Sequence, residues 1–264
     1  MSFNCNRIYE TARRTLELYV IDRKHLESPI NNSLFETKAV GAGCLYQEGE
    51  KTYIFSVEHL NPGIDTSVLV LSSIENGRSK MKNLNFNHMS LCYKNPRGLF
   101  FCKHIDFLWM EKCEETTFGF YNWVGSSKEE IKYKGEIQPF LNISTPNICD
   151  YYYFGGAIQQ SKDSYNKRID GSFVSFRCEY IKEVEEGKYY EFKVMQEDNM
   201  EPINLSQLQG LSGAPIFDSN YNLVSLLVGG YTEGNVIKGV NLDYAMKEVS
   251  RFKEQNNIVT IQVD

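Results

Sequence analysis

Hydrophobic and polar positions follow one pattern before residue 36 and another after it. In the first segment, apolar residues recur at every fourth position, as Ile8, Ala12, Leu16 and Val20. Glu10 and Arg14 lie four residues apart, so a helix would bring their opposite charges together. This pattern predicts an amphipathic helix over residues 7–24, which ends before Pro29 and the asparagines that follow it. We therefore expect residues 1–36 to form an N-terminal helical extension.

From residue 37 onward, short apolar runs alternate with clusters of turn-forming residues. About thirteen of these runs have the length of β-strands, namely residues 40–46, 52–57, 67–72, 89–93, 106–110, 118–124, 130–138, 151–157, 172–181, 189–195, 214–217, 223–228 and 236–242. Strict alternation of strands and helices is missing, so the pattern predicts an all-β barrel or sandwich. Residues 243–255 return to a helical pattern, with Asp243 in position to cap the helix.

Composition and charge narrow the class of protein. The chain has 264 residues, 42% of them hydrophobic, which is enough for a large core. It carries 28 basic and 34 acidic residues, and this net charge of −6 argues against a nucleic-acid partner. No run of about 18 apolar residues is present, and no apolar signal core follows the N-terminus. We therefore expect a cytoplasmic protein, or one delivered elsewhere by means that the sequence does not show, and no membrane partner.

Seven cysteines are scattered along the chain, and none forms a C-x-x-C motif. An odd number of dispersed cysteines without a signal peptide indicates free thiols in a reducing compartment. The alternative is a zinc site built from two histidines and two cysteines, His88, Cys92, Cys102 and His104. Their spacing matches no recognised zinc pattern, so we expect neither a metal nor another cofactor.

The stretch with the strongest chemical signal runs from Gly210 to Pro215, in which Ser212 lies between Gly210 and Gly213. Glycines allow backbone turns that a Cβ would block, so the serine hydroxyl can stand at a tight bend. The same bend can point successive backbone N–H groups into one concavity, as an oxyanion hole requires. The alternative is an ordinary Gly-Ser loop between strands.

A serine hydroxyl is a weak nucleophile and needs a base. Of the four histidines, His59 stands at the end of a strand of bulky apolar residues. A carboxylate should orient that imidazole, and Asp106 stands at the head of another apolar strand. The simpler alternatives are a surface histidine at a strand end and an aspartate that caps a strand.

The order of these three residues separates the known hydrolase arrangements. All histidines precede Ser212, which excludes an α/β-hydrolase, where histidine follows the nucleophile. The order His59, Asp106, Ser212, with gaps of 47 and 106 residues, is that of the chymotrypsin-like arrangement.

On these motifs the sequence resembles the trypsin-like, or chymotrypsin-fold, serine proteases, and intracellular bacterial or viral members more than secreted digestive ones. The matching segments are residues 41–45, 55–59, 106–109, 210–215, 224–230 and 239–242. The resemblance covers roughly residues 37–255. It implies two six-stranded antiparallel β-barrels, with a helical extension at the N-terminus and a helix at the C-terminus. The implied division is an extension over 1–36, a first barrel over 37–125 and a second barrel with the terminal helix over 126–264.

The resemblance also implies roles for the three residues. Ser212 would attack a peptide carbonyl, His59 would take the serine proton, and Asp106 would orient His59. Backbone N–H groups of Gly210 and Ser212 would form the oxyanion hole.

Three further positions match the substrate-binding part of the family. Gly229 and Gly230 stand where a cleft strand pairs with the substrate backbone. Ser206 stands at the position of the pocket floor, although it reads equally well as a plain loop residue. Leu211 replaces the aspartate that secreted members pair with a newly cut N-terminus.

The function that this resemblance implies is a serine endopeptidase with a protein or peptide substrate, narrow in range and intracellular. The alternative is a catalytically inactive protease-fold module that binds a protein partner. Glu58 favours it, because the family has a small residue before the histidine. A third possibility is an unrelated β protein in which the Gly-Ser loop is a coincidence. The N-terminal helix could pack on the barrels, inhibit in cis or bind a regulator.

Overall fold

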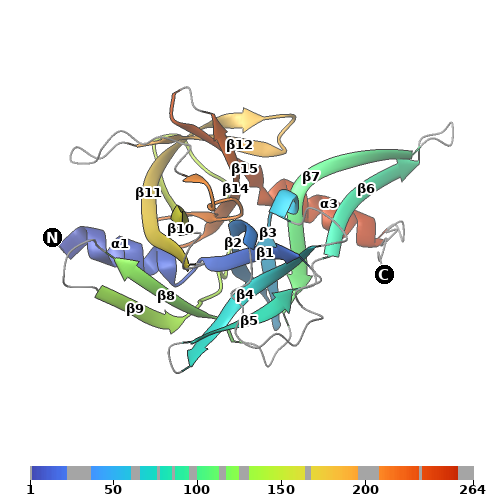
Figure 1. Ribbon diagram of the computed structural model, residues 1–264. Coiled ribbons are helices and arrows are strands. Elements are labelled where there is room, and N and C mark those ends of the chain that lie inside the picture. The colour runs from blue at the N-terminus through green and yellow to red at the C-terminus, as the bar shows by residue number, and fades with distance from the viewer. Residues whose placement is uncertain are drawn as a thin grey trace.

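The computed structural model describes residues 2–22, 37–60, 66–75, 78–84, 87–94, 100–112, 117–124, 131–163, 168–195, 208–231 and 234–254. These residues form fifteen β-strands, two α-helices and one 3₁₀ turn (Figure 1). The all-β prediction is therefore confirmed, with helices only near the two ends of the described chain. No described helix combines the length and the apolar character that a membrane crossing needs.

Seven strands form the first sheet, in the spatial order β5-β4-β1-β2-β3-β7-β6. Their bounds are β1 Leu16–Asp22, β2 Thr37–Glu48, β3 Lys51–Ser56, β4 Thr66–Glu75, β5 Arg78–Leu84, β6 Asn87–Lys94 and β7 Phe100–Glu111. Every neighbouring pair is antiparallel. Six strands were expected here. Five of them form β2, β3, β4, β6 and β7, the expected strand over 118–124 lies outside this sheet, and β1 and β5 were not predicted as strands.

Six further strands form a closed barrel, in the order β10-β11-β12-β15-β14-β13. Their bounds are β10 Tyr151–Asp163, β11 Arg168–Val184, β12 Tyr189–Val194, β13 Pro215–Asp218, β14 Leu223–Tyr231 and β15 Val236–Asn241. A separate hairpin is made by β8 Gly119–Val124 and β9 Ile131–Glu136. The expected boundary between residues 125 and 126 falls between these two strands, outside the described residues.

The predicted helix over residues 7–24 is wrong in its extent. Helix α1 covers Ser2–Ala12, and strand β1 begins at Leu16. The reason is that Leu16, Leu18 and Val20 alternate with partly exposed residues, at the two-residue period of a strand. Strand β1 pairs with β2 on one side and β4 on the other, which buries its apolar face. Residues 1–36 are thus not an entirely helical extension.

Helix α1 packs against strands β10 and β11 of the closed barrel, at the left of Figure 1. Its contact face includes Thr11, which is fully buried. The Thr11 hydroxyl donates to the carbonyl of Arg7 at 2.8 Å, so the Ser175 hydroxyl of β11 donates to Thr11 Oγ1 at 3.0 Å. The predicted charge pair between Glu10 and Arg14 also forms.

Helix α3, Leu242–Glu254, confirms the predicted C-terminal helix. Ala245 and Val249 are buried in the core. The cap differs from the prediction, because Asn241 rather than Asp243 accepts a hydrogen bond from the backbone N–H of Tyr244, at 3.1 Å.

Candidate active site

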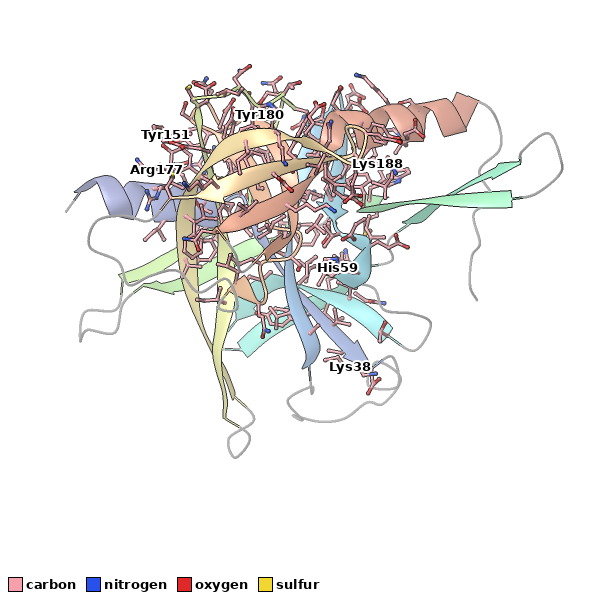
Figure 2. The ribbon with its side chains drawn as sticks, turned by 90° about the horizontal axis from the view of Figure 1, so that it is seen from above. Lys38, His59, Tyr151, Arg177, Tyr180 and Lys188 are labelled. Carbon is pink, nitrogen blue, oxygen red and sulfur yellow. The ribbon has the colours of Figure 1, made fainter. Side chains whose placement is uncertain are left out.

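His59 lies on the short turn that follows strand β3. The strand carries Tyr53, Ile54 and Phe55 into the core, and the 3₁₀ turn η1, Glu58–Leu60, lifts the chain out of the sheet after Val57. Leu60 packs so closely on Gly41 of β2 that a Cβ there would lie 2.2 Å from the leucine side chain. This contact holds the turn against β2 and leaves the His59 side chain 44% exposed. Figure 2 shows His59 between the first sheet and the closed barrel.

Asp106 lies at an irregular point of strand β7. Leu108 pairs with His88 and His104 pairs with Ser90, so residues 105–107 of β7 stand opposite a single residue of β6. The pairing of β7 with β3 extends no further than Leu108. A bulge of this kind re-aims a side chain next to a functional site. Here it takes Asp106 out of both ladders.

The carboxylate of Asp106 grips His59 at two points. Nδ1 of the imidazole lies 2.7 Å from Oδ2, and the backbone N–H of His59 donates to Oδ1 at 3.1 Å. The aspartate side chain is only 13% exposed, so these bonds are shielded from water. With a carboxylate as its acceptor, Nδ1 carries the hydrogen and Nε2 points elsewhere.

Burial and hydrogen bonding act on the Asp106 pKa in opposite directions. Burial by itself raises the pKa, because the charged form loses water. The ring and backbone N–H groups of His59, with the N–H of Glu58, donate to the carboxylate and lower it. The net pKa lies below the usual value of an aspartate, so Asp106 is ionised at neutral pH.

The loop that carries Ser212, residues 208–214 (the Ser212 loop), is hydrogen-bonded both to the first sheet and to the closed barrel. The N–H of Ala42 on β2 donates to the Ser212 carbonyl at 2.7 Å, and the N–H of Gly213 donates to the Leu227 carbonyl on β14 at 2.7 Å. Leu211, fully buried, anchors the loop in the core of the closed barrel.

Two backbone donors of this loop stay without an acceptor among the described residues. The N–H groups of Leu211, Gly213 and Ala214 are hydrogen-bonded, at 3.0, 2.7 and 2.8 Å. Those of Gly210 and Ser212 have no such partner within the described ranges. Gly210 has a φ of 99°, in the region that favours glycine, which sets up the bend between them. Two donors at one bend, neither of them bonded to an acceptor among the described residues, have the arrangement that an oxyanion hole requires.

Strand β2 brings the segments of His59 and Ser212 to adjacent positions. Gly41 contacts Leu60, next to His59, and the following residue, Ala42, bonds to Ser212. A Cβ at Gly213 would lie 2.6 Å from the hydroxyl of Ser56, three positions before His59. Three residues span at most about 10 Å, and a 3₁₀ turn shortens that distance. The Ser212 loop thus lies in the same region of the molecule as the turn that carries His59, and His59 is hydrogen-bonded to Asp106.

Gly229 and Gly230 lie on β14, and both are exposed. Strand β13 pairs with β14 as far as Leu226, and the Ser212 loop bonds to Leu227. Beyond Leu227, no described strand pairs with this side of β14, while the other side pairs with β15. Ser206, the expected pocket-floor residue, lies outside the described residues.

The alternative zinc site falls on strands β6 and β7. Cys92 stands opposite Cys102 in the strand register, but the side chains of all four expected ligands lie outside the described part. Among the described side chains, no three histidines, cysteines or carboxylates gather as a metal site. Cys44 and Cys178 are buried free thiols, as predicted, and burial raises the pKa of both; Cys149 is also a free thiol, but it is exposed.

Comparison with known proteins locates this geometry among solved folds. No protein-family model matches the chain, and no curated sequence does. The solved structure of the serine endoprotease from Yersinia pestis is similar, with 14% sequence identity and a TM-score of 0.51. The aligned region covers 97% of this chain and 69% of the Yersinia chain. The fold is chymotrypsin-like. Tobacco etch virus protease, complexed with product, is also similar, at 10% identity over 93% of this chain and 80% of its own, with a TM-score of 0.48. An active-form protease from M. tuberculosis matches at 10% identity over 93% and 84%, with a TM-score of 0.49. At these identities the likeness concerns the fold, so the roles of individual residues rest on the geometry of this chain.

Two residues next to the site are absent from the predictions made on sequence. The buried hydroxyl of Ser56 donates to the Ala42 carbonyl at 2.7 Å, under the Ser212 loop. Tyr189, on the closed barrel, reaches Asp106 across the molecule. The sequence around Ser56 and Tyr189 does not indicate these contacts, because each contact depends on a partner that is distant in the chain.

Proposed function

We propose that the protein is a serine endopeptidase that acts through Ser212, His59 and Asp106. The observation that carries the proposal is the 2.7 Å hydrogen bond between Nδ1 of His59 and the shielded carboxylate of Asp106, beside the Ser212 loop. An imidazole held in this way presents Nε2 as a general base. The fold supports the proposal by analogy, since proteins of similar fold are serine proteases.

In the first step, Ser212 Oγ attacks the carbonyl carbon of the scissile peptide while Nε2 of His59 takes the hydroxyl proton. The imidazolium then gives that proton to the leaving nitrogen, the C–N bond breaks, and an ester forms at Ser212. Water then attacks the carbonyl carbon of this ester while Nε2 of His59 takes its proton. The proton passes to Ser212 Oγ as the ester bond breaks, which releases the acid product and the free serine.

Asp106 acts on His59 and not on the substrate. Its lowered pKa keeps it ionised at neutral pH, so it holds the hydrogen on Nδ1 and stabilises the imidazolium that forms. The carboxylate stays ionised throughout. This role requires the shielding and the two hydrogen bonds described above.

The developing negative charge on the carbonyl oxygen would be held by the N–H groups of Gly210 and Ser212. Each such donor contributes on the order of 3 kcal/mol to the transition state. The free side of β14 at Gly229 and Gly230 supports a substrate bound as an added strand, through backbone hydrogen bonds. Backbone pairing of this kind favours an extended peptide or protein as substrate. The narrow intracellular range, the cytoplasmic location and a regulatory role of helix α1 stay predictions.

A fluorophosphonate probe tests the proposal without knowledge of the substrate. It reacts with an activated serine to form a phosphonyl ester and releases fluoride. We expect mass spectrometry to find the adduct on Ser212 of the folded wild type, and Ser212→Ala to abolish it. His59→Ala should slow labelling at least 100-fold, because the base is lost.

Ser219→Ala is the matched control. Ser219 is an exposed serine seven positions further along the chain, so its loss should leave labelling unchanged. A folded wild type that is not labelled at Ser212 would contradict the proposal and favour the alternative, a catalytically inactive module that binds a partner. Labelling spread over several serines would contradict it equally.

A further inference from the structure

The backbone N–H of Asp106 lacks the partner that a strand residue normally has. The bulge in β7 removes residues 105–107 from pairing with β6, and pairing with β3 ends at Leu108. A buried N–H without an acceptor is strongly unfavourable, so a bulge at a buried residue needs one from elsewhere. The acceptor is the phenol oxygen of Tyr189, 3.3 Å from the Asp106 nitrogen.

Tyr189 belongs to the other half of the molecule. It is the first residue of β12 in the closed barrel, and only 6% of it is exposed. The ammonium of Lys238 on β15 lies 4.1 Å from the centre of its ring, and Lys238 is ion-paired with Glu185. The backbone pairs with Val240 of β15. The ring is therefore held on its face, at its root and at its hydroxyl.

We propose that Tyr189 is a positioning residue for the triad. Its hydroxyl, from the closed barrel, holds the main chain of Asp106 in the first sheet in place. His59 follows strand β3 of the first sheet and Asp106 lies on its strand β7, whereas Ser212 precedes strand β13 of the closed barrel. The bond from Asp106 to Tyr189 links the carboxylate that orients the imidazole to the half that carries the nucleophile. The effect on activity rests on the function proposed above; the effect on the Asp106 main chain does not.

Tyr189→Phe isolates the hydroxyl, because the ring and its contact with Lys238 remain. Tyr190→Phe is the matched control. Tyr190 is the next residue on the same strand, 2% exposed, and packs on the other face against Tyr180 and Phe192. Both variants lose one buried phenol oxygen, but only the first loses a contact with Asp106.

The first measurement is amide hydrogen exchange with NMR of the His59 ring, and it needs no catalysis. In Tyr189→Phe, we expect the Asp106 amide to exchange on the order of tenfold faster. We also expect the downfield signal of the His59 Nδ1 hydrogen to broaden or shift, because its acceptor is less well held. In Tyr190→Phe, both should match the wild type. Unchanged Asp106 exchange and an unchanged Nδ1 signal in Tyr189→Phe would overturn the proposal.

Lys238→Met is a second variant, in case Tyr189→Phe does not fold. It removes the ammonium from the face of the Tyr189 ring and leaves the Tyr189 hydroxyl in place. We expect Asp106 exchange to accelerate about twofold to fivefold, less than when the hydroxyl itself is lost. If the Asp106 amide exchanged at the wild-type rate in a folded Lys238→Met, that result would contradict a role for the Tyr189 ring in holding Asp106.

The second measurement is the rate of fluorophosphonate labelling in a double-mutant cycle with Asp106→Asn. Tyr189→Phe alone should slow labelling about fivefold to tenfold. In the Asp106→Asn background, the same change should cost less than about twofold, because Tyr189 acts through the carboxylate. Equal losses in both backgrounds would show a general loosening of the fold and would overturn the positioning role. If the wild type is not labelled at all, the proposed function fails, and amide exchange still decides the role of Tyr189.

Discussion

Gly213→Ala is the sharpest test of how the Ser212 loop meets the first sheet. Gly213 has a φ of 86°, a backbone conformation that favours glycine. A Cβ at this position would lie 2.0 Å from the carbonyl oxygen of Ala42 and 2.6 Å from the hydroxyl of Ser56. The carbonyl belongs to the backbone of a buried strand and cannot rotate away, so the loop itself must move.

The size of the effect follows from that movement. Real Cβ contacts essentially never fall below 3.0 Å, so the loop must retreat by about 1 Å. Such a shift stretches the 2.7 Å bonds from Ala42 to Ser212 and from Gly213 to Leu227 beyond hydrogen-bond range. Each bond contributes about 1 kcal/mol, and the left-handed backbone costs alanine about 1–2 kcal/mol. We expect Gly213→Ala to lower the free energy of unfolding by about 3–4 kcal/mol.

Thermal unfolding of the full chain measures this loss. For a chain of this size, a loss of about 3–4 kcal/mol corresponds to a fall in Tm of about 10 °C. Gly234→Ala is the matched control, since Gly234 has nearly the same φ, 80°, and a Cβ there would lie an ordinary 3.7 Å from Val236. The control should lose only the backbone part, about 1–2 kcal/mol. Fluorophosphonate labelling of Gly213→Ala should also drop, because the loop carries Ser212.

Equal Tm values for the two alanine variants would refute the reasoning. That result would mean that the Ser212 loop does not pack closely against β2. The inference that this loop lies near the turn of His59 would then fail as well.

Two further predictions concern single contacts. Because the pKa of folded Asp106 lies below the unfolded value of about 3.9, its contribution to stability is complete above about pH 5 and is lost as the pH falls through the folded pKa. Urea unfolding should therefore find Asp106→Asn less stable by about 1–2 kcal/mol at pH 7, and the gap should close below pH 4; a gap independent of pH would contradict the ionised pair with His59. Thr11→Val should destabilise the protein by about 1–2 kcal/mol, because the buried Ser175 hydroxyl loses its acceptor. Adding Ser175→Ala should restore part of that loss, and a strictly additive double variant would show that the two hydroxyls do not interact.

Strand β1 shows where sequence reasoning fails and why. A spacing of four fits one turn of a helix, and it also fits two repeats of a strand. Ile8 and Ala12 belong to helix α1, whereas Leu16 and Val20 belong to β1, although the four residues share one spacing. The decision comes from β2 and β4, whose backbone groups pair with β1 on both sides. No local pattern contains those partners.

The candidate site divides in the same way. The sequence alone marked Ser212 by the glycines of a tight bend and His59 and Asp106 by their places at strand ends, because these are local features. It also determined the β class and the C-terminal helix, since alternation and helical periodicity lie within each segment. Only the tertiary structure decided the bulge that frees Asp106, the contact between β2 and the Ser212 loop, and the reach of Tyr189 across the molecule. Each of these depends on two segments that are distant in the chain and meet through packing, which local order does not encode.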